Sequence, residues 1–409
     1  MTRFKGGLLG VLGAVMLVAA ACGNGNDDNS AGDGATGSPG SRLQSYDANA
    51  TGEGELRLID WPYYATKAVV KPFEEQTGCQ VTVKDANTSD EMVNLMRQQG
   101  GTAWDGVSAS GDATLRLIGG GDVAAIDVSS FPNYTNVMPT LQAPGHNTID
   151  GVHYGVPYEW GPNVLMYNTD VVKSAPDSWS IAFEAGSPYA GKITAYDSPI
   201  YIADAAMYLK AHQPDLDITD PYELTQDQFD AAVDLLKQQN DLISKYWALY
   251  TEEIDGFESG DMVAGTAWPV NQNLILSDGK VSVASVTPSE GVTGWADTWM
   301  MSSHAEHPIC MMQWMNWTLS DGVQSTTAVA FGATPSVASA CTQLQSDLAG
   351  AYGKTIAKQI YPVYHCGEDD YLKSIYLWKT PLPDCGDDRG QSCVDYSRWT
   401  SAWTDVRGA

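Results

Sequence analysis

The sequence predicts an α/β fold built on parallel sheet, in a chain long enough for two domains. Its 409 residues exceed the usual size of one compact domain. Hydrophobic residues make up 43% of the chain, with 13 Trp and 20 Tyr, which supplies a large core and excludes a disordered or fibrous protein. From Glu55 onward, strand-like and helix-like segments alternate, which is the rhythm of a parallel α/β sheet.

The first half of the ordered chain predicts three strands separated by helices. Runs of alternating or continuous apolar residues predict strands over residues 55–60, 80–84 and 104–109. The 3.6-residue spacing of apolar residues predicts helices over 66–76, 89–100 and 113–119, and Ser89 is a candidate N-cap for the second of them.

The second half continues the same α/β pattern. Apolar runs predict strands over residues 161–167, 191–196, 262–267, 281–286 and 299–301. A helix over 227–239 begins after Thr225, which forms a capping box with Gln228 three residues later, and a further helix is predicted over 310–319.

The amino terminus has the layout of an export signal. Arg3 and Lys5 precede an apolar stretch, residues 8–21, that is too short for a comfortable membrane span. The small residues before Cys22 resemble the lipobox of bacterial lipoproteins, which implies cleavage of residues 1–21 and acylation of the Cys22 thiol. An ordinary cleavage site with an incidental cysteine is the alternative. Residues 22–51, rich in Gly, Asn, Asp and Ser, predict a flexible tether.

The six remaining cysteines predict disulfide bonds rather than a metal site. An even number of cysteines in an exported chain predicts three bridges, although six cysteines allow 15 connectivities. Cys385 and Cys393 flank a short loop that favours a local bridge. A zinc site needs ligand pairs two to four residues apart, and no cysteines have that spacing, so we expect neither metal nor cofactor. The six are Cys79, Cys310, Cys341, Cys366, Cys385 and Cys393.

The charge of the chain argues against nucleic-acid binding. Lys and Arg number 22 against 50 Asp and Glu, for a formal net charge of −28. Phosphate contacts require clustered cations, which such a chain does not offer. Two segments that could suggest catalytic or phosphate-binding motifs do not match them. The Ser108–Gly111 segment lacks the spacing of a nucleophile elbow, and the Gly119–Gly121 cluster lacks the Lys of a phosphate-binding loop.

One set of short motifs resembles a known family. The segment from Leu58 to Tyr64, and the one from Phe73 to Val81, look like the start of the spermidine/putrescine-binding proteins of polyamine ABC transporters. Further motifs follow in the family's order over about residues 55–340: residues 105–110, 156–161, 167–168, 178–179, 268, 287–291, 295–297 and 334–335.

The resemblance implies a two-lobe, periplasmic-binding-protein-like fold of type II with the ligand in the interlobe cleft. Residues 52–158 and 296–340 are expected to form lobe 1, and residues 159–295 and 341–409 lobe 2. The resemblance, with the short loop noted above, favours the pairs Cys79–Cys310, Cys341–Cys366 and Cys385–Cys393.

The resemblance also assigns ligand-binding residues. A polyamine needs aromatic walls for its methylenes and carboxylates for its ammonium groups. Aromatic family positions are matched here by Trp61, Tyr64, Trp268 and Trp295. Asp297 matches the carboxylate that holds an amine, and Ser110 a hydroxyl beside the ligand.

At other positions the sequence departs from the family. Asp112 stands where tyrosine is common and adds a carboxylate if it faces the cleft. Asp197 lies near an expected acid, and Ser198 and Tyr201 stand where further acids are common. Asp197 and Tyr201 are candidate ligand contacts, and Glu159 is a candidate substitute at the far end of the ligand. Trp378 in the tail is a candidate to fill the place of a missing family aromatic.

These observations predict a membrane-anchored, extracytoplasmic solute-binding protein that delivers a polyamine to an ABC importer. We expect it to act as a monomer and to perform no covalent chemistry. Two alternatives stay open: the same scaffold binding another small organic cation, and an extracellular enzyme that uses the cleft carboxylates as acid and base.

The lipobox generates the first testable prediction. Cys22→Ser removes the thiol that would be acylated, so we expect loss of lipid labelling and release of the protein into the medium. Metabolic labelling with a fatty-acid analogue and cell fractionation measure the two effects. Continued labelling and unchanged membrane retention would refute the prediction.

Overall fold

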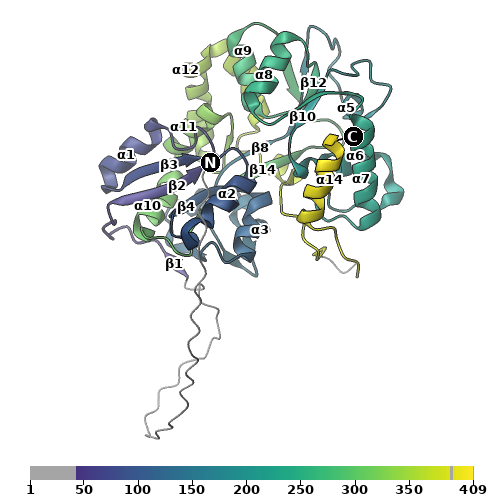
Figure 1. Cartoon of the computed structure of the whole chain (residues 1–409). Helices are drawn as coiled ribbons and strands as arrows, with labels where there is room; N and C mark the ends of the chain where they lie inside the picture. Colours follow the sequence, from purple (N-terminus) through teal and green to yellow (C-terminus); the bar gives the residue numbers. More distant parts are fainter. Residues whose placement is uncertain (1–42, 387–389, 409) are drawn as a thin grey trace, which may run out of the picture. The chain divides into compact units, whose positions relative to one another are not determined.

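Two large mixed sheets organise the part of the chain that the computed structural model describes, residues 43–386 and 390–408 (Figure 1). The predicted export signal, Cys22 and most of the predicted tether lie outside these residues. Among the helices of the described residues, none combines the length and the apolar character that crossing a bilayer requires.

The larger sheet has seven strands and is built around β14 (Thr293–Met301), which lies between β4 (Gly106–Ser110) and β8 (Val156–Pro162) and is antiparallel to both. Every residue of these three strands is buried. The other strands are β2 (Glu55–Asp60), β3 (Gln80–Asp85), β15 (Thr334–Pro335) and β16 (Tyr376–Leu377). The associated helices are α1 (Lys67–Thr77), α2 (Ser89–Met96), α3 (Gly111–Gly119), α10 (Pro308–Thr318) and α11 (Asp321–Phe331).

The second sheet has five strands in the order β11-β10-β12-β9-β13. These are β9 (Val164–Asn168), β10 (Ile193–Tyr196), β11 (Ile243–Trp247), β12 (Ala264–Ala267) and β13 (Val283–Val286). The following helices belong to this half or to the tail: α5 (Ser180–Phe183), α6 (Ile202–His212), α7 (Gln226–Gln239), α8 (Tyr250–Ser259), α9 (Pro269–Asp278), α12 (Cys341–Ile360), α13 (Asp369–Ser374) and α14 (Tyr396–Gly408). The carboxyl-terminal α14 packs against α7, as Figure 1 shows.

A small four-stranded sheet corrects the predicted extent of the tether. Its strands are β1 (Gln44–Ser45), β5 (Ile126–Asp127), β6 (Thr148–Ile149) and β7 (Val152–His153), and α4 (Pro139–Gln142) lies in the same part of the chain. Because Gln44 and Ser45 pair in parallel with β5, and the Tyr46 ring stacks on Phe131, the chain joins the folded body before residue 51.

The chain crosses from the larger to the second sheet at Asn163, between β8 and β9. The Asn163 backbone N–H donates to the Thr293 carbonyl at 2.8 Å, and its side-chain amide donates to the Thr293 hydroxyl at 2.8 Å. Thr293 begins β14, where the chain returns to the larger sheet. Asn163 therefore ties the two crossings together.

Most predicted elements are confirmed, but several details are wrong. The helix predicted over 89–100 ends at Met96, because Gln99 and Gly100 have positive φ. The strand predicted over 161–167 is two strands broken at Asn163, because β8 and β9 pair in different sheets. The strand predicted to begin at 299 begins at Thr293. The N-cap of α2 is Thr88, whose hydroxyl accepts the Glu91 N–H at 3.1 Å, and Ser89 is inside the helix. The capping box of Thr225 with Gln228 is confirmed.

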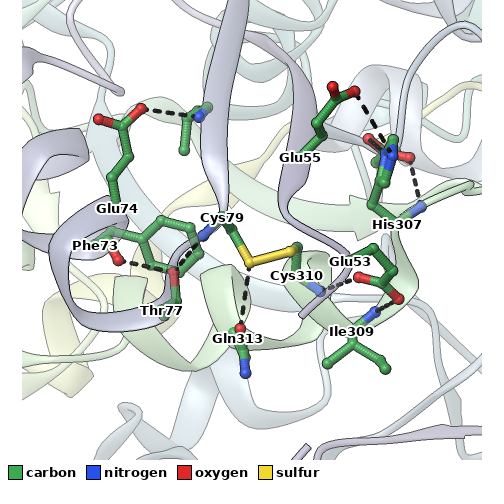
Figure 2. The surroundings of a disulfide bond; sticks show 12 residues. Glu53, Glu55, Phe73, Glu74, Thr77, Cys79, His307, Ile309, Cys310 and Gln313 are labelled. Atoms are coloured by element: carbon green, nitrogen blue, oxygen red, sulfur yellow. Dashed lines mark hydrogen bonds and ion pairs between the residues drawn. A yellow bond between two sulfur atoms is a disulfide. The ribbon is translucent and has the colours of Figure 1, made fainter. Parts of the chain in front are cut away.

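All three predicted disulfides are confirmed: Cys79–Cys310, Cys341–Cys366 and Cys385–Cys393. Figure 2 shows the first, which joins the start of β3 to α10. Beside it, the Glu53 carboxylate accepts the backbone N–H groups of Ile309 and Cys310, which have no partners within the helix.

Gly52 fits this corner because it has no side chain. A Cβ at this position would lie 2.5 Å from the Cys79 sulfur and 2.6 Å from the Cys310 sulfur. Both distances are far below van der Waals contact, so any larger residue would push the incoming chain off the disulfide.

The disulfides generate a stability prediction. In the chain-entropy account, a bridge stabilises more when it closes a longer loop. Cys79–Cys310 spans 231 residues and Cys385–Cys393 spans 8. We expect double alanine substitution of the first pair to lower the free energy of unfolding by about 4–5 kcal/mol, and of the second by about 2–3 kcal/mol. Denaturant titration of both variants measures this, and equal losses would contradict it.

Candidate ligand-binding site

The centre of the site is the carboxylate of Asp297, on the buried strand β14. Trp295 precedes it by two residues, so both side chains leave the same face of the strand. Asp297 lies opposite Ser110, the last residue of β4, in the sheet register. The Ser110 hydroxyl donates to one Asp297 carboxylate oxygen, and the Tyr64 hydroxyl, from the segment after β2, donates to the other.

This carboxylate is buried without a cation. Burial raises the pKa of Asp297 to about 7, although the hydrogen bonds from Ser110 and Tyr64 oppose the shift. No basic side chain of the described residues lies within ion-pair distance of Asp297. A carboxylate that has hydrogen-bond donors but no counter-charge is well suited to an ammonium group.

Aromatic side chains surround Asp297 in a small central cavity of about 20 Å³. The lining residues are Trp61, Ser110, Trp268, Trp295, Asp297, Phe331 and Trp378. This set brings together six of the residues that the sequence analysis named as candidates, and only Phe331 is new. The Trp268 indole N–H donates to Asn163 at 3.1 Å, which fixes the ring beside the crossing between sheets.

Trp378 reaches the site because the tail adds a strand to the larger sheet. β16 pairs with the start of β14, and the Trp378 N–H donates to the Gly294 carbonyl at 2.7 Å. The Trp378 backbone lies so close to Gly111 that a Cβ there would stand 1.8 Å from the Trp378 carbonyl oxygen. The glycine at the start of α3 therefore allows the tail to cross.

An acidic cavity of about 160 Å³ adjoins the centre, sharing Trp61, Trp268 and Trp378 with it. Three aspartates line it: Asp90, Asp112 and Asp197. No three His, Cys, Asp or Glu side chains of the described residues come together to hold a metal ion.

The three aspartates differ in their partners. Asp90 forms an ion pair with Arg116 at 2.6 Å, and Asp197 forms one with Arg407 of α14 at 2.6 Å. Asp112 accepts a hydrogen bond from the Ser89 hydroxyl at 2.8 Å, and burial raises its pKa to about 6. Asp112 forms no ion pair among the described residues, although the nearby charge of Arg116 opposes the rise of its pKa, and it is the second carboxylate suited to a cation.

An apolar cavity of about 220 Å³ adjoins the centre through Trp61, Trp268 and Phe331. Its remaining lining is Pro62, Tyr63, Asn87, Ala248, Leu249, Tyr250, Val270, Leu274 and Ala330. These residues lie on the segments between β2 and α1, between β3 and α2, and between β11 and α8, and on α8, α9 and α11. The site therefore has one acidic and one apolar extension.

Two predicted ligand contacts lie elsewhere. Tyr201 is fully buried, packs edge-on against Tyr196 and Trp403, and accepts a hydrogen bond from Gln239 at 3.0 Å. Glu159 lies on β8 and lines none of the three cavities. Neither side chain lines these cavities, and their roles as ligand contacts stay predictions. Asp197 does line the acidic cavity, but Arg407 already neutralises it.

Comparison with known proteins agrees with this geometry. A family model described as bacterial extracellular solute-binding protein matches residues 68–349, more than half of the chain. The chain belongs to this family.

Relatives and solved structures extend the comparison. The chain is 24% identical over 286 residues to the putrescine-binding periplasmic protein SpuD of Pseudomonas aeruginosa, covering 66% of this chain and 75% of the relative. It is 24% identical over 278 residues to the putrescine-binding periplasmic protein PotF of Escherichia coli, covering 64% and 73%. The crystal structure of the spermidine/putrescine ABC transporter substrate-binding protein PotD of Streptococcus pneumoniae aligns with a TM-score of 0.67 at 16% identity, over 87% of this chain and 98% of that one. These likenesses confirm the predicted type II solute-binding fold.

Sequence reasoning missed several residues of the site. Phe331 ends α11 and faces Trp295 edge-on, with ring centroids 5.7 Å apart. Nothing in its local sequence distinguishes it from a core residue. Asn163 directly follows the motif that the resemblance matched over 156–161, and its polar side chain between two apolar strands was the available signal.

Behind the site lie two further buried carboxylates, Asp60 and Glu159, whose oxygens have no hydrogen-bond partners in the structure. Burial raises the pKa of both well above the ordinary range, and the charge of Asp297 raises each further. A native state that keeps protons on these groups loses stability as the pH rises from the ordinary carboxyl pKa towards the raised one.

We therefore predict that Glu159→Gln stabilises the ligand-free protein at pH 7. Between the ordinary carboxyl pKa and the raised one, a single such group lowers the free energy of unfolding of the wild type by up to about 1.4 kcal/mol per pH unit. The variant has no carboxyl group at position 159, so its free energy of unfolding does not fall on that account. Denaturant titrations at pH 5, 6 and 7 measure it, with the exposed Glu75→Gln as control. A variant less stable than wild type at every pH would show that the carboxylate is stabilising.

Proposed function

We propose that this solute-binding protein carries a polyamine of the putrescine or spermidine type to an ABC importer. The observation that carries the proposal is the buried Asp297 carboxylate, which has two hydroxyl donors and no cation within the described residues. Removing a charge from water is costly unless it is paired, so an arriving ammonium completes the site.

The rest of the site suits a short dication. Asp112 offers a second carboxylate in the adjoining acidic cavity, and Trp61 and Trp268 form a shared wall between the two. Indole faces attract ammonium groups and cover methylenes. The names of the relatives, two putrescine-binding proteins and a spermidine/putrescine transporter component, support the same ligand class.

Ligand release requires the site to open. We propose that the larger sheet and the five-stranded sheet are the cores of two lobes, corresponding in outline to lobe 1 and lobe 2 of the sequence analysis. The crossings at Asn163 and Thr293 would then act as the hinge. The protein acts as a monomer. A lipid on Cys22 holds it at the extracytoplasmic face of the cell membrane, where it docks on the permease subunits of its importer.

The two alternative functions left open by the sequence can be tested with the same purified protein. Another small organic cation would satisfy Asp297 as well, and a panel of amines in a thermal-shift assay separates it from polyamines. An enzyme would use Asp297 and Asp112 as acid and base and would convert the bound ligand. We propose that no covalent chemistry occurs, and recovery of unchanged ligand after incubation tests this.

Asp297→Asn is expected to weaken putrescine and spermidine binding strongly. The substitution keeps the shape of the side chain but leaves a desolvated ammonium without its counter-charge, which costs about 2–5 kcal/mol, or roughly 30-fold to several thousand-fold in affinity. Isothermal titration calorimetry measures the change.

Asp204→Asn is the matched control for this variant. Asp204 is also buried, burial also raises its pKa to about 7, and it accepts hydrogen bonds from Tyr196 and Thr293, but it lines none of the three cavities. Equal binding by both variants and wild type would exclude Asp297 as the anchor.

Wild-type affinity for the amines should also fall as the pH drops below about 7, because protonated Asp297 cannot pair with an ammonium.

A further inference from the structure

We infer that the natural ligand is an amine with an apolar arm the size of an aromatic ring, which occupies the apolar cavity beside Asp297. The inference rests on the proposed amine-binding function and narrows its substrate class. It comes from the unequal chemistry of the two extensions of the site, one acidic and one apolar.

The apolar cavity offers no counter-charge to a second ammonium group. No Asp, Glu, Lys or Arg side chain of the described residues lines it. The hydroxyls of Tyr63 and Tyr250 are 3.0 Å apart and hydrogen-bond to each other across its rim. A charged arm placed here would lose its hydration without gaining a counter-charge, whereas a hydrocarbon or aromatic arm would gain from leaving water.

The cavity has the size and the walls for an aromatic ring. Its volume is about 220 Å³. A cavity of about 150 Å³ holds benzene, so a phenyl group with a short linker fits. The side chains of Trp61, Tyr63, Tyr250, Trp268 and Phe331 supply aromatic walls, which favour offset or edge-on ring contacts.

Two residues that line the cavity occupy locally unfavourable positions. Tyr63 has φ +76° and is 51% exposed, a conformation that bulky residues rarely adopt. Leu249 occupies the N-cap of α8 and is 46% exposed, although leucine is among the poorest N-cap residues. Both side chains line the apolar cavity, where an aromatic arm would cover them.

The inference is tested with three ligands that share one diamine: putrescine, N-benzylputrescine and spermidine. Calorimetric titration of the wild type should show N-benzylputrescine binding about 10- to 100-fold tighter than putrescine, the gain from burying one aromatic group. Spermidine, which extends the same diamine with a charged arm, should show no such gain.

Leu249→Asp is the diagnostic variant, because aspartate is a good N-cap and α8 should remain at least as stable. It places a charge at the rim, so the preference for N-benzylputrescine over spermidine should fall about tenfold or reverse. Val171→Asp is the matched control: Val171 is also 46% exposed but lines none of the three cavities, so the preference should not change.

The outcomes separate the inference from the proposed function. Putrescine binding without a gain from the benzyl group, or an equal preference in Leu249→Asp and wild type, overturns the inference alone. Absence of binding to all three amines overturns the proposed function and the inference with it.

Discussion

The buried charge of Asp297 is the constraint on which the arrangement of the cleft depends. Desolvating a carboxylate costs several kcal/mol, and hydrogen bonds recover only part of that cost. Three separate segments meet to form these hydrogen bonds. β14 carries Asp297, the end of β4 supplies the Ser110 hydroxyl, and the segment after β2 supplies the Tyr64 hydroxyl. The remaining deficit is a positive charge, which the proposed ammonium ligand would supply.

The resemblance to the polyamine-binding family predicted Trp295 and Asp297 as site residues, and their short-range spacing predicted their common orientation. Trp295 and Asp297 stand two residues apart in an apolar run, and a strand then places both on one face. The capping box of Thr225 with Gln228 is similarly local. The N-cap of α2 shows the limit of such reasoning, since Thr88 and Ser89 are both competent caps and only the folded backbone decides between them.

Residues whose role depends on tertiary packing could not be assigned from the sequence. Glu159 and Tyr201 carry polar groups that suit a ligand, and only the folded structure shows that neither lines the cavities around Asp297. Trp378 was a candidate, yet what brings it to the cleft is the pairing of β16 with β14, strands far apart in the chain. The apolar cavity is likewise assembled from segments that no local pattern links.

The position of β14 has a consequence for how the chain folds. β4 and β8 precede it by more than a hundred residues and pair with it on either side, so both have open edges until β14 is made. Non-local pairing of this kind slows folding, and open strand edges invite wrong partners. Many chains fold their amino-terminal domain first during synthesis. Here the larger sheet is complete only after residues 293–301 have been made, although β2, β3 and β4 can pair with one another earlier.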